Sequence, residues 1–190
     1  MSKLVNFAKD FAIKSHGTQL HGCLNIDKHL ANVAKHVERH AEHHSAIYDH
    51  GLTEYVDCLV AAAWLHDVIE DTNVTIDDIE DEMVERGFAN QITPVVSIVS
   101  AVTDEPGKSR MERHMNTYWK IRAHEGALLV KLCDRRHNQS RSIKHGEIYA
   151  AMYAKEYNYF KFALWKPGQF EELWDELDNQ NKKLQEIIGW

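Results

Sequence analysis

Apolar residues recur every three or four positions along nearly the whole chain, which is the spacing of one face of an α-helix. The 190-residue sequence contains only three prolines, so few positions interrupt this pattern. Alternation with a period of two, which marks a half-buried strand, is rare. We therefore expect an all-α protein whose helices pack into a bundle.

Start and stop signals divide this pattern into separate helices. Asp27 is expected to be the N-cap of a helix with a core-facing stripe. Thr53 is expected to begin the most apolar helix, which continues to about Asp71. Further helices are expected near the N-terminus up to His16, from Thr75 to Gly87, from Pro94, from Ser109, and over about 127–138, 148–164 and 170–187.

Length and composition indicate one folded domain. A hydrophobic fraction of 44% and a charged fraction of 27% are ordinary for a globular protein. We expect the domain to span residues 1–165. The segment WKPG at residues 165–168 interrupts the helical pattern, and residues 166–190 are expected to form an amphipathic helix. This helix would pack on the domain or on a partner subunit, so a homo-oligomer is one expectation.

The charge balance restricts the class of partner. A net charge of −7 and a pI of about 6.0 argue against long nucleic acid or an anionic membrane as the main partner. No apolar run approaches the roughly 18 residues of a membrane helix. Cys23, Cys58 and Cys133 lack a C-x-x-C spacing. We expect a reduced, cytoplasmic protein that binds a small molecule.

Four chemically active side chains fall within six residues at the end of the most apolar predicted helix. They are His66, Asp67, Glu70 and Asp71. Positions four apart share one face of a helix, so His66 is expected near Glu70, and Asp67 near Asp71. Burying one imidazole with three carboxylates is costly unless a cation balances their charge. The run therefore predicts a metal site.

Two other segments supply residues that complete such a site. His29 precedes the apolar stripe of its predicted helix by one residue, which places it at the inner edge. Asp134 follows an apolar run, and a buried carboxylate needs a partner. Together with His66 and Asp67 they offer two nitrogen and two oxygen ligands. This set suits Mn²⁺, Fe²⁺ or another first-row metal better than Ca²⁺.

The order of these four ligands resembles the H…HD…D signature of HD-domain metal-dependent phosphohydrolases. Residues 66–72 (HDVIEDT) are similar to the HDxxEDT motif in the hydrolase domain of RelA/SpoT homologues and their small stand-alone relatives. Residues 102–104 (VTD) and 131–138 (KLCDRRHN) resemble two further segments of that branch, VTD and KLADRxxN. The likeness covers about residues 7–162, nearly the whole chain.

The resemblance implies an all-helical HD domain that holds one Mn²⁺, with Fe²⁺ or Zn²⁺ as alternatives, and acts on a nucleotide. The implied reaction is removal of pyrophosphate from the 3′ position of (p)ppGpp. Each family role carries over to one matching position. The implied metal ligands are His29, His66, Asp67 and Asp134; the residues implied to orient or deprotonate the attacking water are Glu70 and Asp71; the expected substrate contacts are Lys131, Arg135, Asn138 and Tyr157.

One segment departs from the family pattern. The (p)ppGpp hydrolases usually carry a basic stretch of the type RRxxGTPY before the first metal histidine, and this chain has HGTQLHGCLN at residues 16–25. The sequence therefore predicts the metal centre more firmly than the substrate. One alternative is a phosphatase or pyrophosphohydrolase that acts on an NADPH-type dinucleotide or a dNTP. Another is a non-catalytic nucleotide sensor.

Overall fold

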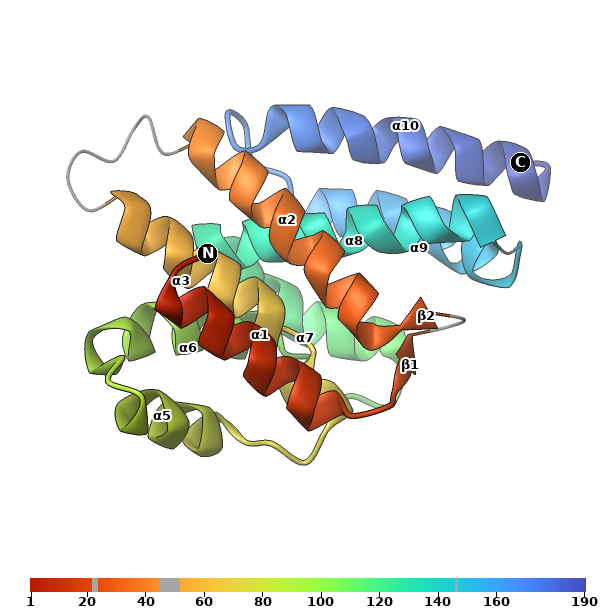
Figure 1. Cartoon of the computed structure of the whole chain (residues 1–190). Coiled ribbons are helices and arrows are strands. Elements are labelled where there is room, and N and C mark those ends of the chain that lie inside the picture. The colour runs from red at the N-terminus through yellow and green to blue at the C-terminus, as the bar shows by residue number, and fades with distance from the viewer. Residues whose placement is uncertain (22–23, 45–51, 146) are drawn as a thin grey trace.

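The computed structural model describes residues 1–21, 24–44, 52–145 and 147–190, and it confirms the all-α prediction (Figure 1). A two-stranded antiparallel hairpin, β1 (Leu20–His21) and β2 (Leu24–Asn25), joins the first two helices. The helices are α1 (Lys3–His16), α2 (Ile26–His44), α3 (Leu52–Leu65), α4 (Val68–Asp71), α5 (Ile76–Glu85), α6 (Ile92–Val102), α7 (Arg110–Ala123), α8 (Glu125–His145), α9 (Glu147–Leu164) and α10 (Glu171–Ile188), with a 3-10 turn at Ala89–Gln91.

Helix α3 lies in the core, as its composition predicts. It packs against α1, α2 and α6, and every residue from Cys58 to Leu65 is buried. Three consecutive alanines, Ala61 to Ala63, are fully buried. Their small side chains allow neighbouring helices to approach α3 on more than one face. The C-terminal end of α3 is thereby fixed deep inside the molecule.

The apolar helix ends earlier than the sequence predicts. We expected it to continue to about Asp71, whereas α3 ends at Leu65 and a separate short helix, α4, begins at Val68. The His66 ring explains the break, because its Nδ1 donates to the Ala63 carbonyl at 2.8 Å. In a continuous helix that carbonyl would accept from the Asp67 N–H. His66 and Asp67 therefore occupy a turn between two helices.

Local capping signals account for several boundaries. Thr75 and Asp78 form a reciprocal capping box at the start of α5, where a helix is predicted to begin. Ser109 Oγ accepts from the Glu112 N–H at the start of α7. Gly87, with φ of +81°, follows the end of α5 in the left-handed region. The prediction for Asp27 is wrong, because α2 begins at Ile26 and Asp27 lies in its first turn.

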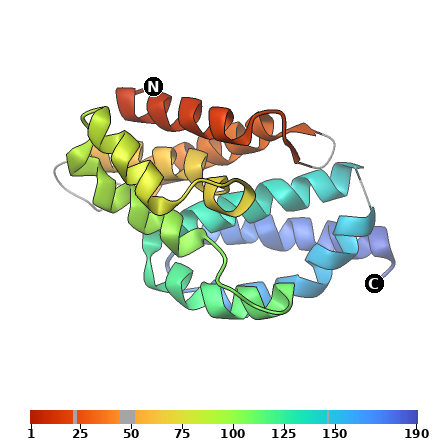
Figure 2. The same cartoon turned by 90° about the horizontal axis from the view of Figure 1, so that it is seen from below.

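Helix α8 runs through the middle of the molecule, between α1 on one side and α9 on the other (Figure 2). It extends from Glu125 to His145, beyond both ends of the predicted range. Its neighbours are α2, α3, α6, α7, α9 and α10. A helix surrounded on so many sides must bury polar residues too, and Asp134, Arg135 and His137 are all buried.

The C-terminal helix α10 packs along α8 and α9 of the same chain (Figure 1). Its inward face carries Leu173, Trp174, Leu177 and Leu184, each no more than 2% exposed. Contact with a partner subunit, and a domain boundary near residue 165, stay predictions.

Two further sequence expectations concern cysteine and the membrane. Cys58 and Cys133 are buried free thiols, and Cys23 lies outside the described residues. Among the described residues, no helix combines the length and hydropathy needed to cross a bilayer.

The packing of α10 predicts the effect of truncating its apolar face. Leu177→Ala should lower the free energy of unfolding by about 2–5 kcal/mol, because a fully buried leucine leaves a cavity. Ile187→Ala, at a position 39% exposed on the same helix, is the control and should cost less than about 1 kcal/mol. Urea denaturation measures both. Equal effects at the two positions would contradict the docking of α10 on the domain.

Candidate metal centre and adjoining cavities

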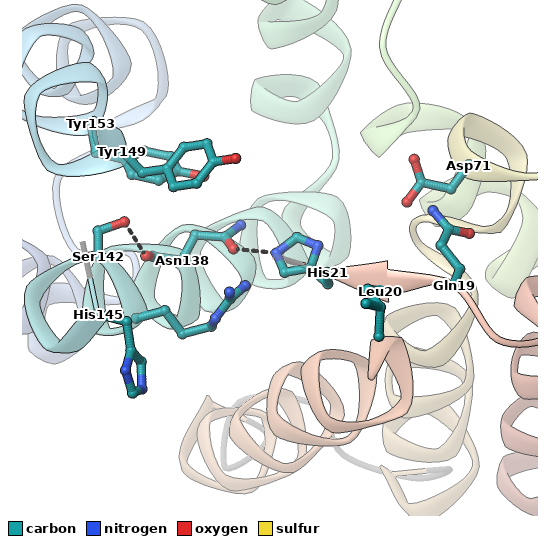
Figure 3. Close-up of a pocket in the computed structure, with 10 residues that line it drawn as sticks. Gln19, Leu20, His21, Asp71, Asn138, Ser142, His145, Tyr149 and Tyr153 are labelled. Carbon is teal, nitrogen blue, oxygen red and sulfur yellow. Dashed lines mark hydrogen bonds between the residues drawn. The ribbon is translucent and has the colours of Figure 1, made fainter. Parts of the chain in front are cut away.

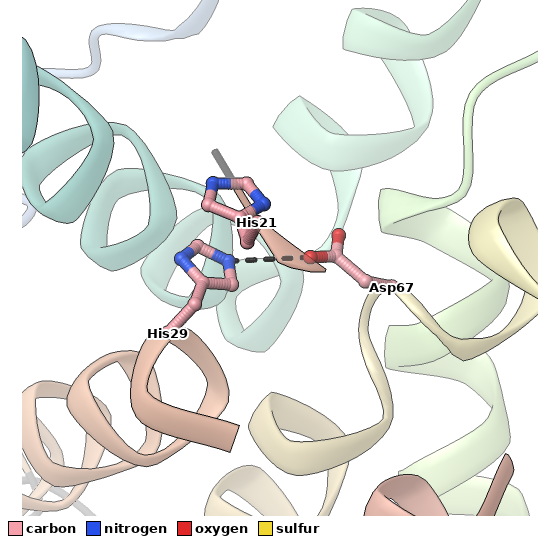
Figure 4. Close-up of side chains that lie close together, drawn as sticks. All are labelled: His21, His29 and Asp67. Carbon is pink, nitrogen blue, oxygen red and sulfur yellow. Dashed lines mark ion pairs between the residues drawn. The ribbon is translucent and has the colours of Figure 1, made fainter. Parts of the chain in front are cut away.

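Three separate elements bring together the four predicted ligands. His29 lies in the first turn of α2, His66 and Asp67 lie in the turn after α3, and Asp134 lies in α8. His29 Nε2 is 3.2 Å from Asp67 Oδ2 (Figure 4). The same nitrogen is 3.5 Å from Asp134 Oδ1. His66 Nε2 is 3.2 Å from Asp67 Oδ1 and 3.3 Å from His29 Nε2. The four side chains thus face one point.

These separations fit a bound divalent metal. With metal–ligand bonds of about 2.1 Å, adjacent ligand atoms stand about 3.0 Å apart in octahedral geometry and about 3.4 Å apart in tetrahedral geometry. The measured distances of 3.2, 3.3 and 3.5 Å lie close to these values. His29, His66 and Asp134 are buried and offer ligand atoms within 4.8 Å of one another. The donor set is chemically and geometrically suited to a metal.

The hydrogen bond to Ala63 prepares His66 for this role. A carbonyl only accepts, so His66 Nδ1 carries a proton and its Nε2 faces Asp67 and Asp134. A metal-ligating imidazole must present a lone pair, and in this tautomer Nε2 supplies it.

Without a metal, His66 carries an additional proton whose charge partly balances the two carboxylates. Burial lowers the pKa of His66, but the carboxylates of Asp67 and Asp134 outweigh it and raise the pKa to about 9. Burial likewise raises the pKa of Asp67, and the two imidazoles override it and hold that pKa well below its usual range. Protons and metal ions therefore compete for His66.

An inner cavity of about 240 Å³ opens beside this centre and contains both predicted catalytic carboxylates. Burial raises the pKa of Glu70, with Asp104 adding to the effect and Lys131 opposing it. Burial and then Asp67 raise the pKa of Asp71. Glu70 Oε1 also accepts from the Asp104 N–H at 2.6 Å, which fixes its position. A raised pKa makes each carboxylate a better proton acceptor.

Three cations line the same inner cavity. Lys131 and Arg135, both predicted from the sequence, are joined by Arg110 from the start of α7, which the sequence did not single out. Lys131 Nζ lies 3.5 Å from Asp134 Oδ2. Arg110 and Arg135 both pair with Glu156, at 2.8 and 3.4 Å. The Lys131, Arg110 and Arg135 side chains are donors suited to a phosphate group.

An outer cavity of about 520 Å³ adjoins the inner one (Figure 3). The residues that line both cavities are His21, Asp71, Asn138 and Tyr153. The outer walls combine tyrosine rings, from Tyr149 and Tyr153, with the basic side chains of Arg141 and His145. Flat apolar rings beside cations are suited to a nucleoside carrying phosphate.

Asn138 reaches the cavities but is largely engaged by the protein. Its Nδ2 donates to Asp134 Oδ1 at 2.6 Å, and its Oδ1 accepts from His21 Nε2 at 2.9 Å. The His21 ring in turn stacks on His29, with ring centroids 4.1 Å apart (Figure 4). Sequence reasoning missed His21, although it lies within the segment that departs from the family pattern.

The structure does not bring Tyr157 to the site. Its hydroxyl donates to Asp178 Oδ1 on α10 at 2.7 Å, and the residue is buried. Tyr153, one helical turn earlier in α9, lines both cavities instead. Tyr153 therefore lies beside the cavities, at the place where the sequence predicted Tyr157. The error is one turn of a helix, the smallest shift that keeps a residue on roughly the same face.

The chain is similar to a known family and to known proteins. The family model of the HD domain matches residues 26–139. Human guanosine-3′,5′-bis(diphosphate) 3′-pyrophosphohydrolase MESH1 is 34% identical over 92 residues, or 48% of this chain and 46% of that protein. The chain thus matches about half the length of this relative. The solved structure of a metazoan SpoT orthologue that hydrolyses ppGpp and plays a role in starvation responses has a TM-score of 0.67 at 22% identity, covering 96% of each chain, and shows the same fold.

The raised pKa of His66 predicts proton release when metal binds. At pH 7 the metal-free side chain is protonated, so uptake of one Mn²⁺ should release about one proton. Calorimetric titration in two buffers of different ionisation enthalpy measures this number. The release should shrink as the pH approaches 9. A binding enthalpy that is the same in both buffers at pH 7 would contradict a protonated His66.

The same shift fixes the sign of a stability change in the metal-free protein. Folding raises the pKa of His66 from 6.5 to about 9, so protonated His66 stabilises the folded state. This stabilisation is fully present below pH 6.5 and is lost as the pH rises through 9. Thermal unfolding in chelator should therefore show a falling midpoint over this interval.

Proposed function

The chain belongs to the HD domain family, and from this premise we propose that it is a metal-dependent hydrolase that removes pyrophosphate from the 3′ position of guanosine 3′,5′-bis(diphosphate). The observation that carries the proposal is the convergence of His29, His66, Asp67 and Asp134 beside a cavity lined by Glu70 and Asp71. The 34% identity to a human enzyme of this activity supports the choice of substrate.

In this proposal His29, His66, Asp67 and Asp134 would hold one divalent ion. Mn²⁺ suits the two carboxylates of this site, and Fe²⁺ and Zn²⁺ suit its two imidazoles. When bound, the ion would polarise a phosphoryl oxygen and lower the pKa of water. The remaining chemistry belongs to the side chains around the cavity.

Glu70 and Asp71 would orient the attacking water and take its proton. A general base works best when its pKa is not far below the working pH, and burial moves the pKa of both carboxyls upward. Glu70 is held by the Asp104 N–H, so it has a fixed direction. Asp71 borders both cavities and therefore lies where water and substrate meet.

The cations of the inner cavity would bind the pyrophosphate that leaves. Lys131, Arg110 and Arg135 surround the space next to the carboxylates. The nucleoside would then extend into the outer cavity, along Tyr149 and Tyr153. Arg141 Nε is buried there without a hydrogen-bond partner among the described residues, so it can bind a second phosphate group.

The residues of the hairpin at the outer cavity favour a second candidate substrate. Gln19, Leu20 and His21, from the segment that departs from the family pattern, line the outer cavity and provide no arginine there. Another small nucleotide, such as an NADPH-type dinucleotide or a dNTP, would meet the same metal centre. A panel of these nucleotides with the Mn²⁺-loaded protein distinguishes them. Pyrophosphate release from ppGpp supports the proposal, phosphate release alone favours a phosphatase, and binding without turnover favours a sensor.

The two groups of acidic residues should separate metal binding from catalysis. Asp67→Ala removes a ligand and should abolish metal retention and turnover together. Glu70→Gln keeps the size of the side chain and removes the base, so it should retain metal and lose about 10²–10⁴-fold in kcat. Metal analysis and pyrophosphate release on the same samples measure both. Full activity in Glu70→Gln would overturn the role of Glu70.

Tyr153 and Tyr157, which lie one turn apart on α9, form a matched pair. Tyr153→Ala should raise KM for the nucleotide, because Tyr153 lines both cavities. Tyr157→Phe should leave KM unchanged and lower the free energy of unfolding by about 1 kcal/mol, since it removes the bond to Asp178. Steady-state kinetics and urea denaturation measure these effects. A higher KM in Tyr157→Phe would restore the original sequence prediction.

A further inference from the structure

A hydrogen bond between two imidazoles lies behind the proposed metal centre. His29 Nδ1 and His137 Nδ1 are 2.7 Å apart, and the residues are 1% and 8% exposed. His137 lies on α8, three residues after Asp134, so it shares a face with that proposed ligand.

Only one proton can lie between these two nitrogens. His29 Nε2 faces Asp67 and Asp134, at 3.2 and 3.5 Å, and must present its lone pair to a metal. Its proton then resides on Nδ1, which donates to His137. His137 Nδ1 is therefore the acceptor, and His137 is a neutral imidazole that carries its own proton on Nε2.

We propose that His137 is a positioning residue that fixes the tautomer and ring orientation of His29 through this hydrogen bond. The inference rests on the proposed function only in taking His29 as a metal ligand. A half-turn of the His29 ring would exchange Nδ1 with a carbon and move Nε2 away from the carboxylates. The bond to His137 opposes that rotation.

The other contacts of His29 do not perform this task. His21 stacks flat on the ring, which restricts tilting but offers Nδ1 no acceptor. The His21 Nε2 is itself engaged by Asn138 Oδ1. His66, the second proposed imidazole ligand, is held by a backbone carbonyl that substitution of a side chain does not remove. His29 alone depends on a side chain for its orientation.

A neutral acceptor also fits the charge of the centre. The outer partner of a metal-ligating histidine is usually a carboxylate, a backbone carbonyl or water. Here Asp67 and Asp134 already supply two negative charges, which balance one divalent ion. A third buried carboxylate behind His29 would leave an uncompensated charge in the interior. An imidazole orients His29 without adding charge.

Two substitutions of nearly equal shape test the acceptor. His137→Leu removes it, whereas His137→Asn keeps an oxygen near the position of Nδ1. The dissociation constant for Mn²⁺ should rise about 10–100-fold in His137→Leu and stay within about threefold of the wild-type value in His137→Asn. With saturating Mn²⁺, His137→Leu should recover most of the wild-type kcat. Calorimetric titration and steady-state kinetics measure these quantities.

A spectroscopic readout tests the proton assignment directly. In Zn²⁺-loaded protein labelled with ¹⁵N at histidine, the spectrum should show His29 protonated at Nδ1 and His137 protonated at Nε2. A scalar coupling between the two Nδ1 nitrogens should report the hydrogen bond. A His137 protonated at Nδ1 would overturn the proposal, because that nitrogen could not accept.

The control is His124→Leu. The His124 imidazole lies away from both cavities, where it is hydrogen-bonded to Ser97 Oγ and to the Ala127 N–H. Metal affinity should not change in this variant. The inference is overturned if His137→Leu binds Mn²⁺ like wild type, or if His137→Asn loses as much affinity as His137→Leu. Failure of the wild-type protein to bind metal would instead refute the proposed function, so the two failures are distinguishable.

Discussion

Two carboxylates held in the protein interior against two imidazoles are the constraint on which the rest of the structure depends. Asp67 and Asp134 both lie within 3.5 Å of His29 Nε2, and each would be costly to bury alone. The four side chains come from α2, from the turn after α3 and from α8. Their meeting point therefore restricts how these helices can cross. The buried alanines of α3 permit the close packing that brings them together.

The position of this centre, at the side of one cavity and near a second, determines what the chain can bind. The inner cavity concentrates cations beside Glu70 and Asp71, whereas the outer cavity offers tyrosine rings and Arg141. A ligand with phosphate at one end and a flat ring beyond it matches both surfaces. The hairpin residue His21 links the outer wall to the centre, since it stacks on His29 and bonds Asn138.

Sequence reasoning succeeded where a local pattern has a single physical solution. The helix predicted from Thr75 begins there, with a capping box between two residues that are three positions apart. It failed where a side chain competes with the backbone, because the bond from His66 to the Ala63 carbonyl ends α3 earlier than its apolar pattern indicates. It also assigned Tyr157 to the substrate site, whereas the structure pairs the Tyr157 hydroxyl with Asp178 on the neighbouring helix α10.

The sequence by itself determined the helical architecture and the four side chains that meet, because periodicity and the grouping of His66 with Asp67 are properties of the chain. Only the tertiary structure decided which tyrosines of α9 line the cavities, that Arg110 joins Lys131 and Arg135, and that His137 lies behind His29. His29 and His137, for example, are 108 residues apart in the sequence. Their contacts arise from the crossing of helices, which no local pattern encodes.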